Sequence, residues 1–183
     1  MADVKKGIIL KGIGGLYFVE TADAVFECKA RGIFRKSGQK PLVGDEVDIL
    51  IGEDGANNTI EEIYPRRSEL MRPPVANLDR LFILSSVRDP NPSTLIIDKM
   101  TAIACWKNIE PVIVITKDDL GDTSELRGIY EKAGIPFFSV SSRDVRGADE
   151  VKAMLSGHIS AFAGNTGVGK SSLLNLIAPE LSL

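Results

Sequence analysis

Along the first third of the chain, hydrophobic and polar positions alternate with the period of β-strands. Five short segments follow this pattern and are separated by Gly, Asn and other turn-forming residues. They cover residues 7–15, 16–21, 24–31, 45–51 and 57–66. Alternation indicates a sheet with one buried face, because successive side chains of a strand point to opposite sides. Five such strands without a helical pattern between them predict a small closed barrel.

From about residue 79 the pattern changes to continuous apolar strands that alternate with helices. Strands are predicted over 80–86, 111–116, 135–140 and 158–164, and helices over 92–107, 124–134, 147–155 and 171–177. Fully apolar strands are typical of a parallel sheet covered by helices on both faces. Pro73 and Pro74 predict a linker over 66–78. We therefore expect an all-β barrel domain at 1–70 and an α/β domain at 71–183.

Residues 164–171, GNTGVGKS, match the phosphate-binding pattern GxxxxGK[ST] in full. Glycines let backbone N–H groups turn toward a phosphate, and Lys170 adds a mobile positive charge for the β- and γ-phosphates. Ser171 offers a hydroxyl to Mg²⁺, so Lys170 and Ser171 are the predicted catalytic residues. The predicted phosphate-binding residues are Gly164, Asn165, Thr166, Gly167, Val168, Gly169, Lys170, Ser171 and Ser172.

Two further segments follow predicted strands and suggest which nucleotide binds. Thr116-Lys117-Asp118-Asp119 resembles the guanine-reading [NT]KxD element of GTPases, in which a carboxylate accepts hydrogen bonds from guanine N1–H and its 2-amino group. Adenine lacks this donor pair, so Asp119 is predicted to select guanine. After the next strand, Ser141 and Ser142 of the sequence SVSS are predicted to lie near guanine O6. The alternative is that both segments are ordinary solvated turns.

The order of these motifs is the reverse of that in an ordinary GTPase, where the phosphate loop comes first. In a parallel α/β sheet the loops at the carboxyl ends of the strands converge on one crevice, whatever their order along the chain. The chain therefore looks like a circularly permuted P-loop GTPase domain that follows a barrel.

A family resemblance follows from the β-rich N-terminal domain, VGDEV at 43–47, TKDD, SVSS and GNTGVGKSS in this order. Over essentially all 183 residues the chain resembles the ribosome small-subunit-dependent GTPase family, RsgA. The resemblance implies a GTP phosphohydrolase that is stimulated by the small (30S) ribosomal subunit and acts in its late maturation. It implies GTP or GDP with Mg²⁺ as ligands and rRNA as a partner. The full-length protein is expected to be a monomer, and its expected location is cytoplasmic.

The resemblance also raises two expectations about what differs or is missing here. Thr116 stands where Asn is commoner, and its shorter side chain is expected to lower nucleotide affinity. The family's switch threonine, DxxG loop and zinc-binding C-terminal domain are expected beyond Leu183. Residues 1–183 alone are therefore expected to hydrolyse GTP no faster than background, and zinc is expected only in that further domain.

The net charge of −3 is small, but positive charge gathers in one segment. Residues 29–40 contain no acidic residue and hold the predicted RNA-binding side chains Lys29, Arg31, Arg35, Lys36 and Lys40. A loop of this kind between barrel strands is where an OB-fold binds nucleic acid. Phe34 either stacks on a base or packs inward. The alternative is an ordinary solvated loop, and the resemblance favours rRNA.

Other features of the sequence limit the possible functions less strongly than these motifs do. No apolar run reaches the roughly 18–20 residues that span a bilayer, and the N-terminus lacks a signal-peptide core, so no membrane association is expected. Cys28 and Cys105 are predicted to be buried thiols, and His158 to have a structural role. Two other functions stay open: an ATP-dependent P-loop protein, for which Asp119 would have no purpose, and an RNA-binding module with a vestigial nucleotide site.

Overall fold

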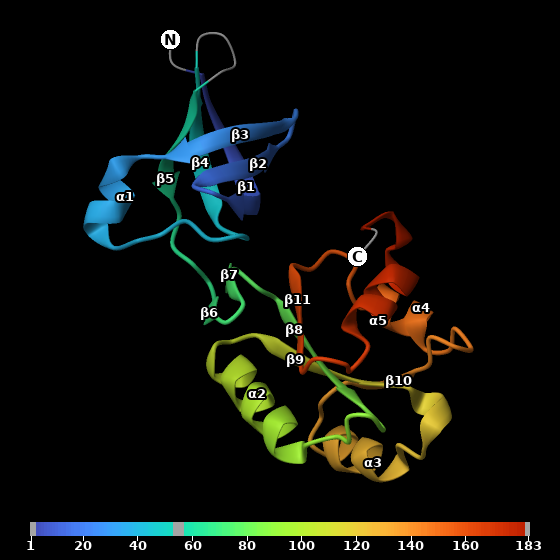
Figure 1. The fold of residues 1–183 in the computed structure, drawn as a ribbon. Helices are drawn as coiled ribbons and strands as arrows, with labels where there is room; N and C mark the ends of the chain where they lie inside the picture. The colour runs from blue at the N-terminus through green and yellow to red at the C-terminus, as the bar shows by residue number, and fades with distance from the viewer. Residues whose placement is uncertain (1–2, 53–56, 182–183) are drawn as a thin grey trace. The chain divides into compact units, whose positions relative to one another are not determined.

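In the computed structural model, the alternating segments of the N-terminal part form a closed five-stranded barrel of the OB type (Figure 1). The structure describes residues 3–52 and 57–181, apart from the side chains of residues 35–37 and 181. The barrel strands are β1 (Asp3–Ile13), β2 (Leu16–Thr21), β3 (Val25–Ala30), β4 (Glu46–Ile51) and β5 (Asn58–Ile63). Their order around the barrel is β1-β2-β3-β5-β4, and the parallel pairing of β3 with β5 closes it.

The barrel interior is filled by the apolar side chains of the alternating pattern. Its core comprises Ile9, Tyr17, Val19, Cys28, Phe34, Val47, Ile49, Ile60 and Ile63. These side chains come from all five strands and from one short helix, so the five predicted strands are confirmed. Phe34 is 8% exposed and packs inward, which decides between its two predicted orientations.

Two segments of this part differ from the sequence prediction. Within the basic stretch 29–40, a helix, α1 (Gly32–Ser37), stands where a loop between strands was predicted. The predicted linker contains a hairpin of β6 (Glu69–Met71) and β7 (Pro74–Ala76), with a cis peptide bond before Pro73. Pro74 is the first residue of its strand, a position where the ladder does not require an N–H donor.

The chain divides into compact units at 1–77 and 78–183, so the domain boundary expected at residue 70 falls inside this hairpin. The C-terminal unit is a parallel four-stranded sheet in the order β10-β9-β8-β11. Its strands are β8 (Arg80–Ser86), β9 (Glu110–Thr116), β10 (Phe137–Val140) and β11 (Ser160–Gly164). Its helices are α2 (Thr94–Trp106), α3 (Ser124–Lys132), α4 (Ala148–Ala153) and α5 (Lys170–Ile177), with short 3-10 turns η1 (Asp118–Leu120) and η2 (Pro179–Leu181).

Helices α2 and α3 lie on one side of this sheet, and α4 and α5 on the other (Figure 1). Alternate strand residues serve the two faces: Phe82 and Val114, for example, join the core cluster under α4 and α5. On the other side, the Tyr130 hydroxyl of α3 donates to the Asp98 carboxylate of α2 over 2.9 Å. The predicted alternation of strands and helices is thus confirmed.

The two cysteines differ in environment, so the prediction that both are buried is wrong for one of them. Cys28 lies in the barrel core, and burial raises the pKa of its thiol to about 11. Cys105 is exposed on α2. None of the helices among the described residues combines the length and apolar character needed to cross a bilayer.

Candidate nucleotide-binding site

The phosphate loop follows β11 directly and is fixed by packing at both ends. Gly164 pairs with Leu84 on the neighbouring strand, and a Cβ at this position would lie 2.4 Å from the Leu84 carbonyl oxygen, so only glycine fits. Val168 is 2% exposed and anchors the loop in the core between the sheet and α5. Gly169, with φ of +86°, then starts α5 in a conformation that other residues rarely adopt.

The charged end of this loop is suited to an anion. The Lys170 ammonium donates to the carbonyl oxygens of Gly164 and Asn165 over 2.8 and 2.7 Å, which holds it over the loop. Ser171 and Ser172 are exposed in the first turn of α5, where helix N–H groups have no partner within the helix. The residues present thus fit a phosphate group, with the Ser171 hydroxyl accessible to a magnesium ion.

Thr116 links the end of β9 to the phosphate loop. Its buried hydroxyl lies 3.1 Å from the carbonyl oxygen of Ser85 and also contacts that of Val168. A hydroxyl carries one hydrogen, so it cannot donate fully to both carbonyl groups at once. Thr116 therefore provides a tether between the TKDD segment and the phosphate loop, although with one donor where an amide would have two.

The two aspartates of TKDD have different surroundings. The exposed carboxylate of Asp119 accepts a hydrogen bond of 3.0 Å from the fully buried Ser141 hydroxyl, which leaves its second oxygen available to a ligand. Asp118 instead pairs with Arg146 at 3.3 Å. Ser141 thus orients Asp119 and joins the TKDD and SVSS segments, while the neighbouring aspartate has a cationic partner of its own.

A small hollow lies where these segments meet. Its volume is about 50 Å³, less than the share of two water molecules in the liquid, so a bound base would rest largely at its rim. It is lined by Thr116, Lys117, Val140, Ser142, Gly169, Ser172, Leu173 and Leu176. The Lys117 side chain reaches across to donate to the Asp89 carbonyl oxygen in the segment after β8. Residues from both predicted base-reading segments and from α5 therefore surround one position.

We expect Thr116→Val to weaken GDP binding about 2- to 10-fold, because the isosteric side chain loses the hydroxyl that contacts the Val168 carbonyl group. A typical intramolecular hydrogen bond contributes about 0.5–1.5 kcal/mol. Thr116→Ser keeps the hydroxyl and should change the affinity less than about 2-fold. Isothermal titration calorimetry with GDP measures both, and equal losses in the two variants would show that the hydroxyl is not the tether.

Comparison with known proteins identifies the family of this chain. Residues 63–183 match the family described as RsgA GTPase, and residues 6–57 match the RsgA N-terminal domain. The chain belongs to the RsgA GTPase family. This membership confirms the family resemblance that the sequence predicted.

RsgA relatives and solved structures cover nearly all of the chain. A protein named small ribosomal subunit biogenesis GTPase RsgA from Alkaliphilus metalliredigens is 44% identical over 98% of this chain and 63% of its own length. The protein of the same name from Ruminiclostridium cellulolyticum is 45% identical over 93% of this chain and 58% of its own. The chain thus spans about three fifths of the length of these relatives.

Two crystal structures show the same fold. YjeQ from Thermotoga maritima is 36% identical, with a TM-score of 0.84 over 97% of this chain and 66% of the other. YloQ, described as a circularly permuted GTPase, is 33% identical, with a TM-score of 0.82 over the same shares. The fold class predicted for this RsgA chain, a barrel followed by a permuted GTPase domain, is confirmed.

The predicted RNA-binding residues lie in the barrel and not at the nucleotide site. Lys29 and Lys40 are exposed, whereas the Arg31 guanidinium pairs with Glu61. The side chains of Arg35 and Lys36 lie outside those that the structure describes.

At the candidate nucleotide site, sequence reasoning missed Arg146 and the Asp89 carbonyl group, which bond to Asp118 and Lys117. Arg146 is a basic residue in the loop after SVSS, and this position was the only signal that could have found it. His158 lies two residues before β11, 4.0 Å from the Asp79 carboxylate.

Proposed function

We propose that this chain binds guanine nucleotides and is the nucleotide-binding part of a GTPase that acts in biogenesis of the small ribosomal subunit. One observation carries the proposal: Thr116 contacts the phosphate loop while Ser141 orients Asp119, so that base-reading and phosphate-binding groups surround one position. The names of the relatives support both the reaction and the biological role.

Within this proposal the residues have separate tasks. Asp119 accepts from guanine N1–H and the 2-amino group, while Lys117 flanks the base. The loop amides and Lys170 bind the phosphates, and Ser171 supplies a hydroxyl to Mg²⁺. When bound, the metal ion neutralises charge that develops on the phosphates during hydrolysis. The contribution of the chain itself is positioning and charge stabilisation, since little covalent chemistry is required of the protein.

The barrel supplies the second part of the proposed function, contact with rRNA. Lys29 and Lys40 are exposed within a stretch that has no acidic residue, and such side chains bind phosphates with a strong dependence on salt. Arg31, Arg35 and Lys36 belong to the same proposed surface. Binding of Arg31 to a phosphate would compete with its ion pair to Glu61, a pair whose arginine is exposed and whose contribution to stability is small.

We expect Lys170→Ala in the intact protein to lower GTP turnover in the presence of small ribosomal subunits about 100- to 1000-fold, the usual effect of removing one donor to a transition-state oxyanion. Lys132→Ala, a matched change at an exposed lysine on α3, should leave turnover unchanged. Phosphate release from GTP measures both. Full turnover by Lys170→Ala would show that the phosphate loop is not the catalytic one.

A further inference from the structure

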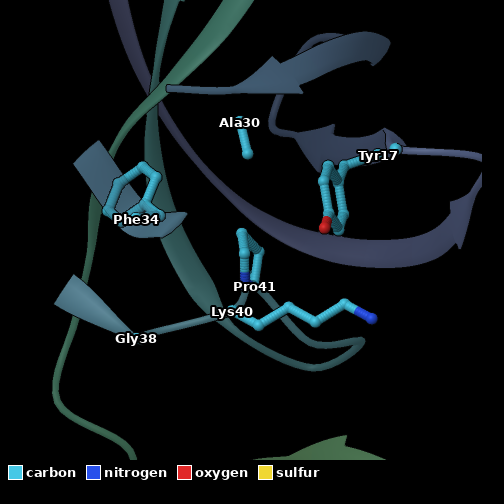
Figure 2. Close-up of a pocket in the computed structure, with 7 residues that line it drawn as sticks. Tyr17, Ala30, Phe34, Gly38, Lys40 and Pro41 are labelled. Carbon is cyan, nitrogen blue, oxygen red and sulfur yellow. The ribbon is translucent and has the colours of Figure 1, made fainter. Parts of the chain in front are cut away.

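A pocket of the barrel unit lies beside α1. This pocket, of about 430 Å³, is within the size range of small-molecule sites. It is lined by Gly15, Tyr17, Ala30, Phe34, Gly38, Lys40 and Pro41 (Figure 2). The lining therefore combines two aromatic rings with a lysine from the acid-free basic stretch.

Tyr17 is the residue that points to a ligand. The residue is 8% exposed, and its hydroxyl, which makes no hydrogen bond within the described part of the chain, is open to the pocket. A tyrosine hydroxyl can both donate and accept, so one that opens into a pocket is available to a ligand. Figure 2 shows this hydroxyl on the side of the pocket where Lys40 and Pro41 lie. The pocket thus offers an unused hydroxyl in a lining that combines apolar side chains with Lys40.

The remaining walls fit a flat ring. Phe34 packs inward and is only 8% exposed, but it still lines the pocket across from Tyr17 in Figure 2, with Ala30 and Pro41 between them. Lys40 is exposed and brings a positive charge to the lining. A flat, polar ring attached to a phosphate satisfies all of these groups together: aromatic and apolar contact, one hydrogen bond, and one charge.

We propose that this pocket binds an unpaired base of an RNA strand, with Lys40 close to a phosphate of the same strand. The inference rests on the proposed contact between the barrel and rRNA, and it adds a base-binding position to a surface otherwise described by charge. Proteins recognise single-stranded RNA by stacking splayed bases on aromatic side chains and by bonding their edges. A protein side chain in the same pocket would leave the phosphate-binding charge of Lys40 unused.

The test compares a single-stranded RNA decamer of mixed sequence with a decamer of the same backbone that carries no bases. Ala30→Trp fills the pocket without changing charge, and Val25→Trp adds the same side chain at an exposed position on the same strand. We expect Ala30→Trp to weaken binding of the decamer about 5- to 100-fold, the range reported for loss of one stacked base, with an unchanged salt slope. The Val25→Trp control should bind like wild type.

The two probes separate the pocket from the charged surface. Wild type should bind the abasic decamer more weakly, whereas Ala30→Trp should bind both decamers alike. Lys29→Ala should instead reduce the salt slope by about 0.7, as loss of one phosphate contact to a single strand does. If that slope changes while Ala30→Trp binds normally, the pocket proposal is wrong and the RNA contact stands. Failure of wild type to bind the decamer or small-subunit rRNA would overturn both.

A second, conservative variant keeps the test decisive if Ala30→Trp does not fold. Tyr17→Phe keeps the buried ring and loses only the hydroxyl. It should therefore weaken binding of the decamer about 2- to 10-fold and leave binding of the abasic decamer unchanged. A 2-aminopurine base in the decamer should lose fluorescence on binding to wild type, because stacking quenches it. Unchanged fluorescence and equal affinity of Tyr17→Phe for the decamer would contradict the proposal. If Ala30→Trp binds isolated ribosomal proteins more weakly than wild type but binds RNA normally, the occupant of the pocket is a protein side chain. That result would also contradict the proposal.

Discussion

Replacing Asp119 with Asn is expected to weaken GDP binding about 30- to 700-fold and to favour xanthosine diphosphate. The carboxylate that Ser141 orients would accept two hydrogen bonds from guanine, and losing such charge-assisted bonds costs about 2–4 kcal/mol. The Asn amide donates to the 2-oxo group of xanthine, which stands where guanine has a donor. Calorimetric titration of the variant with GDP and with xanthosine diphosphate measures this change in nucleotide preference.

The adjacent aspartate provides a matched control for this change. Asp118→Asn alters the same functional group one residue away, but Asp118 pairs with Arg146. We expect its GDP affinity to fall less than about 5-fold, since only a partly exposed ion pair is weakened. An unchanged GDP affinity in Asp119→Asn, or equal losses in both variants, would remove Asp119 from the base-reading role.

The second large effect concerns the stability of the barrel unit. Asp45 is fully buried, and its carboxylate accepts from the Leu42 amide and from the Arg66 guanidinium at 2.7 and 2.8 Å. Arg66→Met would leave this carboxylate buried without its cationic partner. Breaking one side of a buried pair typically costs about 3–5 kcal/mol, and we expect a loss of this size in the free energy of unfolding of the barrel.

The measurement must report on the barrel alone. Tryptophan fluorescence would not do so, because the only tryptophan, Trp106, lies in the C-terminal unit. Amide hydrogen exchange of Val47 and Ile49, both fully buried in β4, gives the local free energy of opening. Glu69→Gln removes a half-exposed partner of the same Arg66 and should cost less than about 1 kcal/mol. Equal protection in wild type and Arg66→Met would contradict the structural role of the pair.

The regular strands and helices were predictable because their hydrophobic period is sustained. The helix α1 was not, since its apolar residues Ile33 and Phe34 are adjacent and no repeat extends over its six residues. The β6–β7 hairpin escaped prediction because Pro73 and Pro74 argue against a strand interior, yet they occupy the turn and the first position of a strand. Sequence patterns locate long elements better than elements of one turn or three residues.

The same reasoning explains what was predictable about the nucleotide site. Motif residues stand at strand ends, and the convergence of parallel strands places those ends together, so the residues of TKDD, SVSS and the phosphate loop could be assigned to one site. The bonds between them could not be predicted. The contact of Thr116 with Val168 joins residues 52 positions apart and depends on loop conformation. The exposure of Cys105 likewise depends on which side of α2 the sheet covers.

Calorimetric titration of the wild-type chain with GDP and with ADP, in the presence of Mg²⁺, tests the account most directly. Both nucleotides carry the same phosphates, so the phosphate loop and Lys170 bind them alike, and any difference in affinity arises at the base. Asp119 can accept two hydrogen bonds from guanine and none of that pair from adenine. We expect GDP to bind at least about 30-fold more tightly than ADP. Equal affinities for the two nucleotides would contradict the assignment of this chain as a guanine-nucleotide-binding protein.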